Sequence, residues 1–354
     1  MIYKSDCKYF QGDVPCKPHK EFGVHCQDCE YYQKLEGRIL IIKLGAIGDV
    51  IRTTPLLRKI KKQHPNYEIW WLTLTPEILP DLVDVKLNFT LENIILLQNI
   101  EFDWLINLDK DMQACSLATM IKAYKKSGFW LENDKPAPIN KLALPKFLTG
   151  LFDDISKANT KSYLEEIFEI AGWNFEKEEY VLDVKSNFQF NLENNNKKIV
   201  GLNTGCGSRW TSRLWPEKHW LELIKMLQDE GYYPLLLGGE AEHDRNKRLA
   251  EQTNATYLGA FPLAQFISLV DKTDIVVTAV TMALHIAIGL KKNIVLLNNI
   301  FNPNEFELYG RGVIVQPDKE CKCFFKGQCT NDYFCMEYLP AMKVFEKIKE
   351  QLNK

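Results

Sequence analysis

The sequence predicts an α/β protein with two similar halves, on three observations. Residues 38–44 are almost all aliphatic, as expected for a strand covered on both faces of a parallel sheet. Strand-like and helix-like segments then alternate along the chain. The alternation pauses at residues 185–198, a polar stretch that ends in three asparagines and two lysines, and resumes at Ile199. We therefore expect a linker between two α/β domains.

Each half divides into expected elements. In the first half, strands are expected at 38–44, 68–74, 94–97 and 104–108, and residues 152–173 are expected to be helical. Pro55 is expected to begin or to kink the helix that follows the first strand. In the second half, strands are expected at 199–203, 234–237, 275–278 and 293–297, and helices at 217–230, 243–252, 263–270, 282–290 and 343–352.

Composition excludes several classes of protein. The 354 residues suggest about two domains, and 46% hydrophobic with 25% charged residues is ordinary for a globular protein. A formal net charge of -2 argues against a nucleic-acid partner, because such proteins are usually basic. No apolar run approaches the ~18–20 residues that span a bilayer. The polar N-terminus has no signal-peptide core, so a cytoplasmic location is expected.

Eight of the ten cysteines fall into two groups of four, which in a reducing compartment suggests metal sites more than disulfides. The groups are Cys7, Cys16, Cys26 and Cys29, and Cys321, Cys323, Cys329 and Cys335. Residues 1–36 have too little apolar sequence to fold by burial alone, so we expect a structural zinc ion there. His19 and His25 are alternative ligands, and one site shared by both chain ends or free thiols are alternative interpretations.

The turn 45–49 follows the first strand and opens a helix, so its backbone N–H groups can hold an anion or polar ligand. Asp49 lies at the carboxyl end of that strand, where α/β sheets place ligands. Its carboxylate is either a general base or only the cap of the helix.

A second loop, 203–216, follows the first strand of the second half. Gly205 and Gly207 allow a ligand close to the backbone, and Arg209 and Arg213 can pair with phosphate oxygens. The alternative is a loop with solvated arginines. Glu242 follows another strand, and is a candidate for bonding ribose hydroxyls or a helix cap.

Together these segments resemble glycosyltransferase family 9, which contains the ADP-heptose:lipopolysaccharide heptosyltransferases. Residues 39–57 (ILIIKLGAIGDVIRTTPLL) resemble the opening strand and loop of the family, and 213–220 (RLWPEKHW) resemble its second-domain phosphate loop. Residues 237–240 and the helix with His285 fall in the family's order. The resemblance covers roughly residues 37–320.

The resemblance implies a GT-B fold, with two Rossmann-like domains facing a central cleft and, here, a Cys-rich metal-binding segment before them. The implied division is 1–36 for that segment, 37–190 for the acceptor domain and 191–354 for the nucleotide-sugar domain. The last of these includes the Cys-rich loop 321–335 and a terminal helix that returns to the N-terminal domain.

The implied activity is inverting transfer of a heptose or similar sugar from a nucleotide diphosphate donor, such as ADP-heptose. The acceptor is a glycan, a lipid-linked glycan or a protein. Asp49 corresponds to the catalytic base, Arg213 to a diphosphate-binding residue and Glu242 to a ribose-binding carboxylate. The donor-side residues are Thr204, Gly205, Gly207, Arg209, Ser212, Arg213, Glu242, Thr281, Met282 and His285, and the acceptor-side residues are Gly48, Arg52 and Asp109. No catalytic divalent metal is expected.

Some relatives that modify proteins hold an iron with four cysteines near this end of the chain, so iron is an alternative to zinc at residues 321–335. A lipid-linked acceptor implies peripheral contact with the inner face of the cytoplasmic membrane. The basic run 58–62 is a candidate for that contact, or simply a solvated helix face.

The sequence departs from the family on the donor side. Val280 stands where many members have an acidic residue, Met282 stands where they have glycine, and Asn298-Asn299 replace a Phe-Gly-Pro-Thr turn. These departures suggest a different donor or lost activity. The alternatives to an enzyme are therefore a non-catalytic nucleotide-sugar-binding or scaffold protein and a nucleotide-binding regulator that senses metal or redox state.

Overall fold

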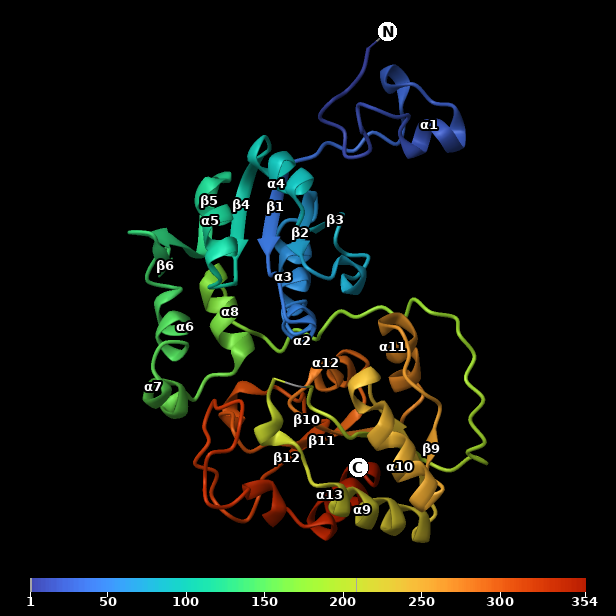
Figure 1. Cartoon of the computed structure of the whole chain (residues 1–354). Coiled ribbons are helices and arrows are strands. Elements are labelled where there is room, and N and C mark those ends of the chain that lie inside the picture. The colour runs from blue at the N-terminus through green and yellow to red at the C-terminus, as the bar shows by residue number, and fades with distance from the viewer. Residues whose placement is uncertain (1, 208) are drawn as a thin grey trace. The chain divides into compact units, whose positions relative to one another are not determined.

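The computed structural model describes residues 2–207 and 209–354 (Figure 1). The chain forms two compact units. The first contains the residues up to Leu44 together with Leu56–Ala143, and the second contains Gly45–Pro55 and Leu144–Lys354. The short segment 45–55 thus packs with the second unit although its neighbours in sequence on both sides belong to the first. The three-part division expected from the sequence stays a prediction.

The first unit contains a six-stranded sheet in the order β3-β2-β1-β4-β5-β6. All neighbours are parallel except β5 and β6, which are antiparallel. The strands are β1 (Gly37–Ile42), β2 (Tyr67–Thr73), β3 (Val85–Asn88), β4 (Glu101–Asn107), β5 (Lys122–Glu132) and β6 (Lys135–Pro138). The helices and 3-10 turns are α1 (Lys17–Phe22), η1 (Cys26–Asp28), α3 (Pro55–Gln63), η2 (Pro76–Ile78), α4 (Leu91–Gln98) and α5 (Met112–Met120).

The aliphatic run of β1 lies at the centre of this sheet, as its composition predicts. Residues 39–42 have no exposed surface, because β2 and β4 flank the strand and helices cover its faces. Pro55 begins α3 rather than kinking it. The strand expected at 94–97 is wrong: these residues lie in α4, whose first turn is capped by Thr90. A run of four apolar residues does not distinguish the two structures.

The second unit contains a six-stranded, fully parallel sheet in the order β12-β11-β10-β7-β8-β9. Its strands are β7 (Ile199–Asn203), β8 (Tyr233–Leu237), β9 (Thr256–Tyr257), β10 (Ile275–Ala279), β11 (Asn293–Leu297) and β12 (Gly312–Val315). Its helices are α2 (Ile47–Ile51), α6 (Leu144–Thr149), α7 (Asp153–Ala158), α8 (Tyr163–Ala171), α9 (Glu217–Asp229), α10 (His243–Thr253), α11 (Leu263–Asp271), α12 (Met282–Gly289) and α13 (Ala341–Leu352). Its 3-10 turns are η3 (Thr211–Arg213), η4 (Glu240–Glu242), η5 (Pro303–Glu305) and η6 (Cys335–Tyr338).

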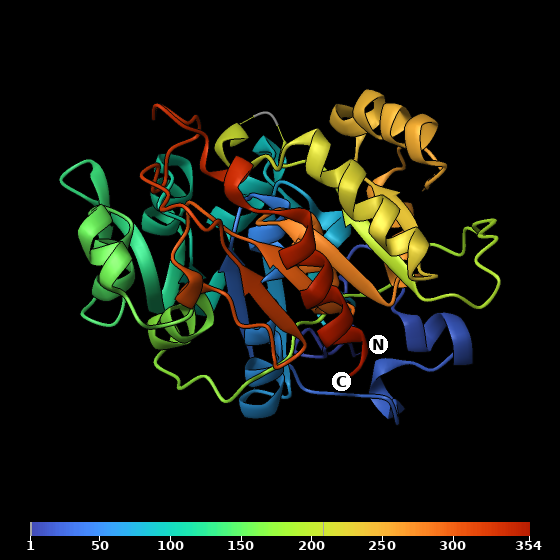
Figure 2. The ribbon, with the colours of Figure 1, turned by 90° about the horizontal axis from the view of Figure 1, so that it is seen from below.

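The elements expected in the second half are confirmed, and the helical middle is divided between α7 and α8. Residues 172–198, all of them described, contain no helix or strand, in agreement with the polar linker that the sequence predicts. The terminal helix α13 packs on α9 and on β11 and β12 (Figure 2). Its apolar residues, Ala341, Val344, Phe345 and Ile348, are buried in the core of the second unit. The sequence instead predicts its return to the N-terminal domain.

None of the helices in residues 2–207 and 209–354 is both long enough and apolar enough to cross a membrane.

Candidate active site

The segment 45–55 carries the predicted base. It follows β1, and Asp49 lies in the first turn of the short helix α2. Its Oδ1 is 3.0 Å from Nε of Arg52, one turn further along. The Asp49 side chain keeps 35% of its surface exposed, whereas that of Arg52 keeps 15%. The carboxylate is therefore oriented by a fixed cation and still accessible to a substrate.

Arg52 is itself held by aromatic and acidic neighbours from other elements. Its guanidinium lies 3.5 Å from the ring centroid of Tyr163, the first residue of α8. Burial acts to lower the pKa of Arg52, but the charges of Asp49 and Glu305 and the nearby tyrosine ring raise it overall. Arg52 is thus permanently charged and can position Asp49 throughout a reaction.

Gly48 explains why the turn needs a glycine. A Cβ at Gly48 would lie 2.8 Å from Cδ2 of His285 and 3.4 Å from Cα of Met282. Only a residue without a side chain therefore lets α2 approach the first turn of α12 this closely. The close approach brings the Asp49 segment next to the N-terminus of α12.

His285 lies under this contact, buried and without net charge. Its Nδ1 is 3.4 Å from the hydroxyl of Tyr180, and the two rings are stacked. Burial, reinforced by the charge of Arg52, lowers the pKa of His285 to about 3. The imidazole is neutral at physiological pH. It supplies packing and a hydrogen bond to Tyr180, and its donor-side role stays a prediction.

A cavity of about 420 Å³ opens beside this segment, within the second unit. It brings together β-strand ends and loops that are far apart in sequence. The predicted donor-side residues that line it are Gly205, Gly207, Arg213, Glu242, Thr281 and Met282. Ile47, two residues before Asp49, lines it as well. The segment that carries the predicted base, through Ile47, and part of the predicted donor loop therefore border one space, although Asp49 itself is not among the lining residues.

Arg213 gives this cavity its positive charge. Its guanidinium donates to the carbonyl oxygens of Val280 and Cys206, the latter at 3.0 Å, while its buried Nε has no hydrogen-bond partner. Burial lowers the pKa of Arg213 from its ordinary value. No carboxylate forms an ion pair with it among the described residues. A partly buried cation without a counter-ion is a natural anion site.

Glu242 contributes the opposite charge to the same cavity. A Cβ at Gly205 would lie 2.1 Å from the Glu242 side chain, so glycine is required for the loop to pass the carboxylate. Oε2 of Glu242 accepts a hydrogen bond of 3.0 Å from the backbone N–H of Gly239. The cavity thus offers a cation and a carboxylate to one ligand.

Four of the predicted residues act from outside the cavity. Thr204 Oγ1 donates to Asn246 at 2.5 Å, and Ser212 Oγ donates to the Lys326 carbonyl at 2.5 Å. Arg209 is exposed, with its guanidinium 5.5 Å from the Trp210 ring centroid. His285 lies behind the wall, as described above. The side chains of Thr204 and Ser212 hold the loop in place, and a donor-side role for these four residues stays a prediction.

Asp109 lies in the first unit, at the end of β4. It forms a buried ion pair with Lys43 and accepts a hydrogen bond from the backbone N–H of Leu44. Burial raises the pKa of Asp109, and the charge of Lys43 opposes this rise. The observed contacts order the end of β1, while an acceptor-side role for Asp109 stays a prediction.

The asparagines after β11, which the sequence marked only as a departure from the family, make structural hydrogen bonds that their sequence did not predict. Nδ2 of Asn299 donates to the carbonyl of Ser212 at 2.8 Å and to Sγ of Cys335 at 3.3 Å. Asn298 donates to the carbonyl of Phe301 at 2.9 Å. Asn299, one of the two asparagines that replace the family's turn, therefore holds the donor loop through its hydrogen bond to Ser212. The available signal was three asparagines in a short run after a buried strand.

The C-terminal cysteines pack directly on that loop. Cys323 Sγ lies 3.4 Å from Cys329 Sγ, and a hydrogen bond from Cys321 lowers the pKa of Cys335. Backbone carbonyls of the same segment accept from the donor loop: Gly327 accepts from the Ser212 N–H at 3.0 Å. In residues 2–207 and 209–354, no group of three or more Cys, His, Asp or Glu side chains has the arrangement of a metal site. The metal expected from the sequence is thus not shown.

The chain belongs to glycosyltransferase family 9 (heptosyltransferase), whose family model matches residues 95–334. It is therefore a glycosyltransferase. The stretch 39–57, which carries the clearest resemblance in the sequence, lies before the matched range. No curated protein sequence matches the chain.

Solved structures show the same fold at low sequence identity. Heptosyltransferase WaaC of E. coli, solved with ADP, is 18% identical, with a TM-score of 0.63 over 89% of this chain and 99% of that one. A family 9 glycosyltransferase from Veillonella parvula is 16% identical, with a TM-score of 0.68 over 90% and 97%. The iron-containing glycosyltransferase TibC of enterotoxigenic E. coli is 14% identical, with a TM-score of 0.56 over 90% and 76%. The two parallel-sheet domains thus resemble those of GT-B heptosyltransferases.

Proposed function

We propose that the protein transfers a heptose or similar sugar, with inversion, from a nucleotide diphosphate donor such as ADP-heptose. The acceptor is a hydroxyl of a cell-envelope glycan or a glycoprotein. The observation that carries the proposal is Arg213, which has no carboxylate partner among residues 2–207 and 209–354 and lies on a cavity that Glu240 and Glu242 also line. The ADP in the WaaC structure supports the nucleotide class.

Asp49 is the base in this proposal. Arg52 orients its carboxylate, and an acceptor hydroxyl can reach the Asp49 side chain because 35% of its surface is exposed. The carboxylate takes the hydroxyl proton as the acceptor oxygen attacks the anomeric carbon of the donor. The new glycosidic bond forms on the face opposite the bond to the diphosphate, which breaks with its electron pair on the leaving oxygen.

The leaving diphosphate gains negative charge in the transition state. Arg213 and the backbone N–H groups around Gly205 and Gly207 are placed to stabilise that charge. Val280 strengthens the effect, because its carbonyl orients Arg213 while its side chain brings no carboxylate to neutralise it. The departure from the family at this position thus favours an anionic ligand. The Glu242 carboxylate is suited to accept bonds from ribose hydroxyls.

We further propose a structural metal ion, zinc or iron, at Cys321, Cys323, Cys329 and Cys335. The donor set fits, because amide groups of Asn331 and Asn299 donate to the sulfurs of Cys323 and Cys335, as thiolate ligands require. TibC is iron-containing. Four thiolates leave no open position, so the ion stabilises this loop and takes no part in transfer.

The proposed location is the cytoplasm, with peripheral contact at the inner face of the membrane when the acceptor is lipid-linked. No divalent metal is proposed at the diphosphate, because Arg213 and backbone N–H groups supply the charge compensation.

The test is thermal stabilisation of the full chain by a panel of nucleoside diphosphates and nucleotide sugars. We expect one diphosphate sugar to raise the melting temperature selectively, because it binds the folded state alone. Arg213→Ala should lose this rise. Arg248→Ala is the matched control, since Arg248 is an exposed arginine paired with Glu217 on the surface. No stabilisation by any member of the panel would contradict the donor site.

The variant Asp49→Asn distinguishes the binding of the donor from the transfer of the sugar. This variant should keep the stabilisation by the donor and lose roughly 10²–10⁴-fold in transfer rate, the usual contribution of a general base. Transfer is measured as nucleoside diphosphate released in the presence of a lipid-linked or protein acceptor. Unchanged transfer would remove Asp49 from the mechanism.

A further inference from the structure

The N-terminal segment 2–36 has almost no hydrophobic core of its own. Pro18 is its single buried residue among those described. Its remaining order rests on exposed contacts, such as the Tyr32 hydroxyl donating to Asp6 at 2.8 Å and the stacking of Phe22 on Tyr31. Such contacts contribute little stability in water, and a segment this small normally needs a staple.

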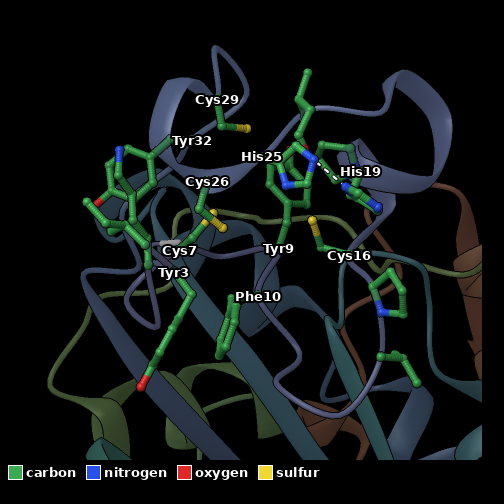
Figure 3. A pocket seen from close by; sticks show the side chains of 16 residues that line it. Tyr3, Cys7, Tyr9, Phe10, Cys16, His19, His25, Cys26, Cys29 and Tyr32 are labelled. Atoms are coloured by element: carbon green, nitrogen blue, oxygen red, sulfur yellow. Dashed lines mark hydrogen bonds between the residues drawn. The ribbon is translucent and has the colours of Figure 1, made fainter.

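The cysteines of this segment all face one cavity. A space of about 370 Å³ is lined by Cys7, Cys16, Cys26 and Cys29, and also by His19 and His25 (Figure 3). The four cysteines are free thiols. The segment therefore directs every cysteine and histidine it has toward a single interior, whereas its lysines and carboxylates are mostly exposed.

Local backbone structure explains this convergence. Cys26 and Cys29 are three residues apart on the tight turn η1, so both thiols lie on the same side of the chain. Cys16 is the N-terminal cap of α1, and its side chain makes no capping hydrogen bond. Cys7 is fixed across the segment by an antiparallel bridge to Lys34. Three separate stretches of chain thus each contribute thiols to the lining of one cavity.

The two histidines form the wall beside Cys16. Nδ1 of His19 lies 2.9 Å from the carbonyl of Val24, and a carbonyl only accepts, so Nδ1 carries the proton. This bond leaves Nε2 as the other ring nitrogen. The His19 and His25 rings are 5.2 Å apart at their centroids. This arrangement adds one further ring nitrogen to the cavity that the thiols line.

We propose that this cavity binds one zinc ion through the thiolates of Cys7, Cys16, Cys26 and Cys29. Thiolate sulfur is the donor that zinc prefers, and a tetrahedral set of four closes the site. The ion takes the place of the missing core. Because the unfolded segment has no formed site, the free energy of zinc binding stabilises its folded state. The side chains must draw together from the present cavity to reach Zn–S distances of about 2.3 Å.

The proposed site is structural and independent of sugar transfer. It has no open coordination position, and its residues are distinct from the cavity of Arg213 and Glu242. Its loss is therefore expected to leave nucleotide binding intact. Zinc content therefore tests this proposal, and nucleotide binding tests the proposed function, so either one can fail without the other.

The first test is the metal content of the full chain, measured by mass spectrometry after purification without added metal. Cys26→Ser combined with Cys29→Ser should lower bound zinc by one equivalent and leave stabilisation by the nucleotide unchanged. Asp28→Asn, an exposed carboxylate between the two cysteines, is the matched control and should keep the zinc. An unchanged zinc content in the double variant overturns the proposal.

The second test counts the sulfur ligands. The protein is stripped with a chelator and refilled with Co²⁺, whose thiolate charge-transfer absorption scales with the number of coordinated sulfurs. Cys7→Ser should lower that absorption, whereas His19→Gln should leave it unchanged. Loss of Co²⁺ in His19→Gln, or two disulfides among these cysteines under reducing purification, contradicts the four-thiolate site.

Discussion

The two cysteine-rich segments have equal numbers of thiols and opposite surroundings. In the C-terminal one, Cys323 and Cys335 are each 1% exposed, and Cys335 belongs to the core of the second unit. In the N-terminal one, all four cysteines are partly exposed around an open cavity. Two cysteines of the first group are buried against an existing core, whereas the second group lies where a core is missing. Two groups with the same number of cysteines therefore lie in different structural settings.

The contacts show what each group supports. The C-terminal loop is hydrogen-bonded to the donor loop through Asn299, Ser212 and Gly327. The N-terminal segment bonds mainly to itself, with Lys8 near Asp84 at 3.5 Å as an ion pair to the rest of its unit. Damage to the C-terminal group should reach the nucleotide site, and damage to the N-terminal group should stay local.

The largest effect is expected from Cys335→Ser. The change puts a smaller, polar hydroxyl in place of a sulfur in an apolar core and lengthens the contact with Asn299, which should cost about 3 kcal/mol of unfolding free energy. Stabilisation by the nucleotide should fall with it. Cys26→Ser should leave that stabilisation unchanged. Urea unfolding with and without ADP measures both, and equal loss in the two variants would remove the contrast.

Acid should destabilise the donor unit through His285. Its folded pKa of about 3 lies below the ordinary 6.5, so the unfolded chain binds the proton first as the pH falls. Stability should decrease by about 1.4 kcal/mol per pH unit below pH 6.5, or about 2 kcal/mol at pH 5. His285→Gln should remove this slope. Melting temperatures at pH 5 and pH 7 test it, and an equal slope in the variant would contradict it.

Asn299→Ala tests the connection between the C-terminal cysteines and the donor loop directly. It removes two hydrogen bonds, to Ser212 and Cys335, and should weaken ADP binding about tenfold, or about 1.4 kcal/mol. Asn331→Ala is the control, because Asn331 donates to Cys323 without touching the donor loop. Calorimetric titration with ADP gives the two affinities. Equal affinities would show that the loop holds its position without Asn299.

The smallest effects are expected from a pair of glycines. A Cβ at Gly327 would lie 2.7 Å from the Arg209 carbonyl, so Gly327→Ala should push the two loops apart and weaken ADP binding a few-fold. Gly23 ends α1 with φ +67° and has open space around it, so Gly23→Ala should cost about 1 kcal/mol locally. The affinity for ADP should fall in Gly327→Ala and stay unchanged in Gly23→Ala. A weaker affinity in Gly23→Ala would mean that the N-terminal segment does affect the site.

Much of the fold followed from the sequence because parallel strands are covered on both faces. Runs such as 39–42 and 294–297 are apolar at every position, and no alternation is needed to recognise them. The strand expected at 94–97 failed because four apolar residues suit a capped helix equally well. Short edge elements, such as β6 and β9, carry no comparable pattern.

The sequence by itself determined the class of the protein and the chemistry of its candidate site. The Gly-Asp turn at 45–49, Arg213 and Glu242 are local signals, since each follows a strand whose end must lie at the ligand edge of a parallel sheet. Only the tertiary structure decided which residues support them. Segment 45–55 packs with the second unit, and Asn299 contacts Ser212, 87 positions earlier, and Cys335, 36 positions later. These are long-range contacts between buried polar groups, and spacing along the chain carries no trace of them.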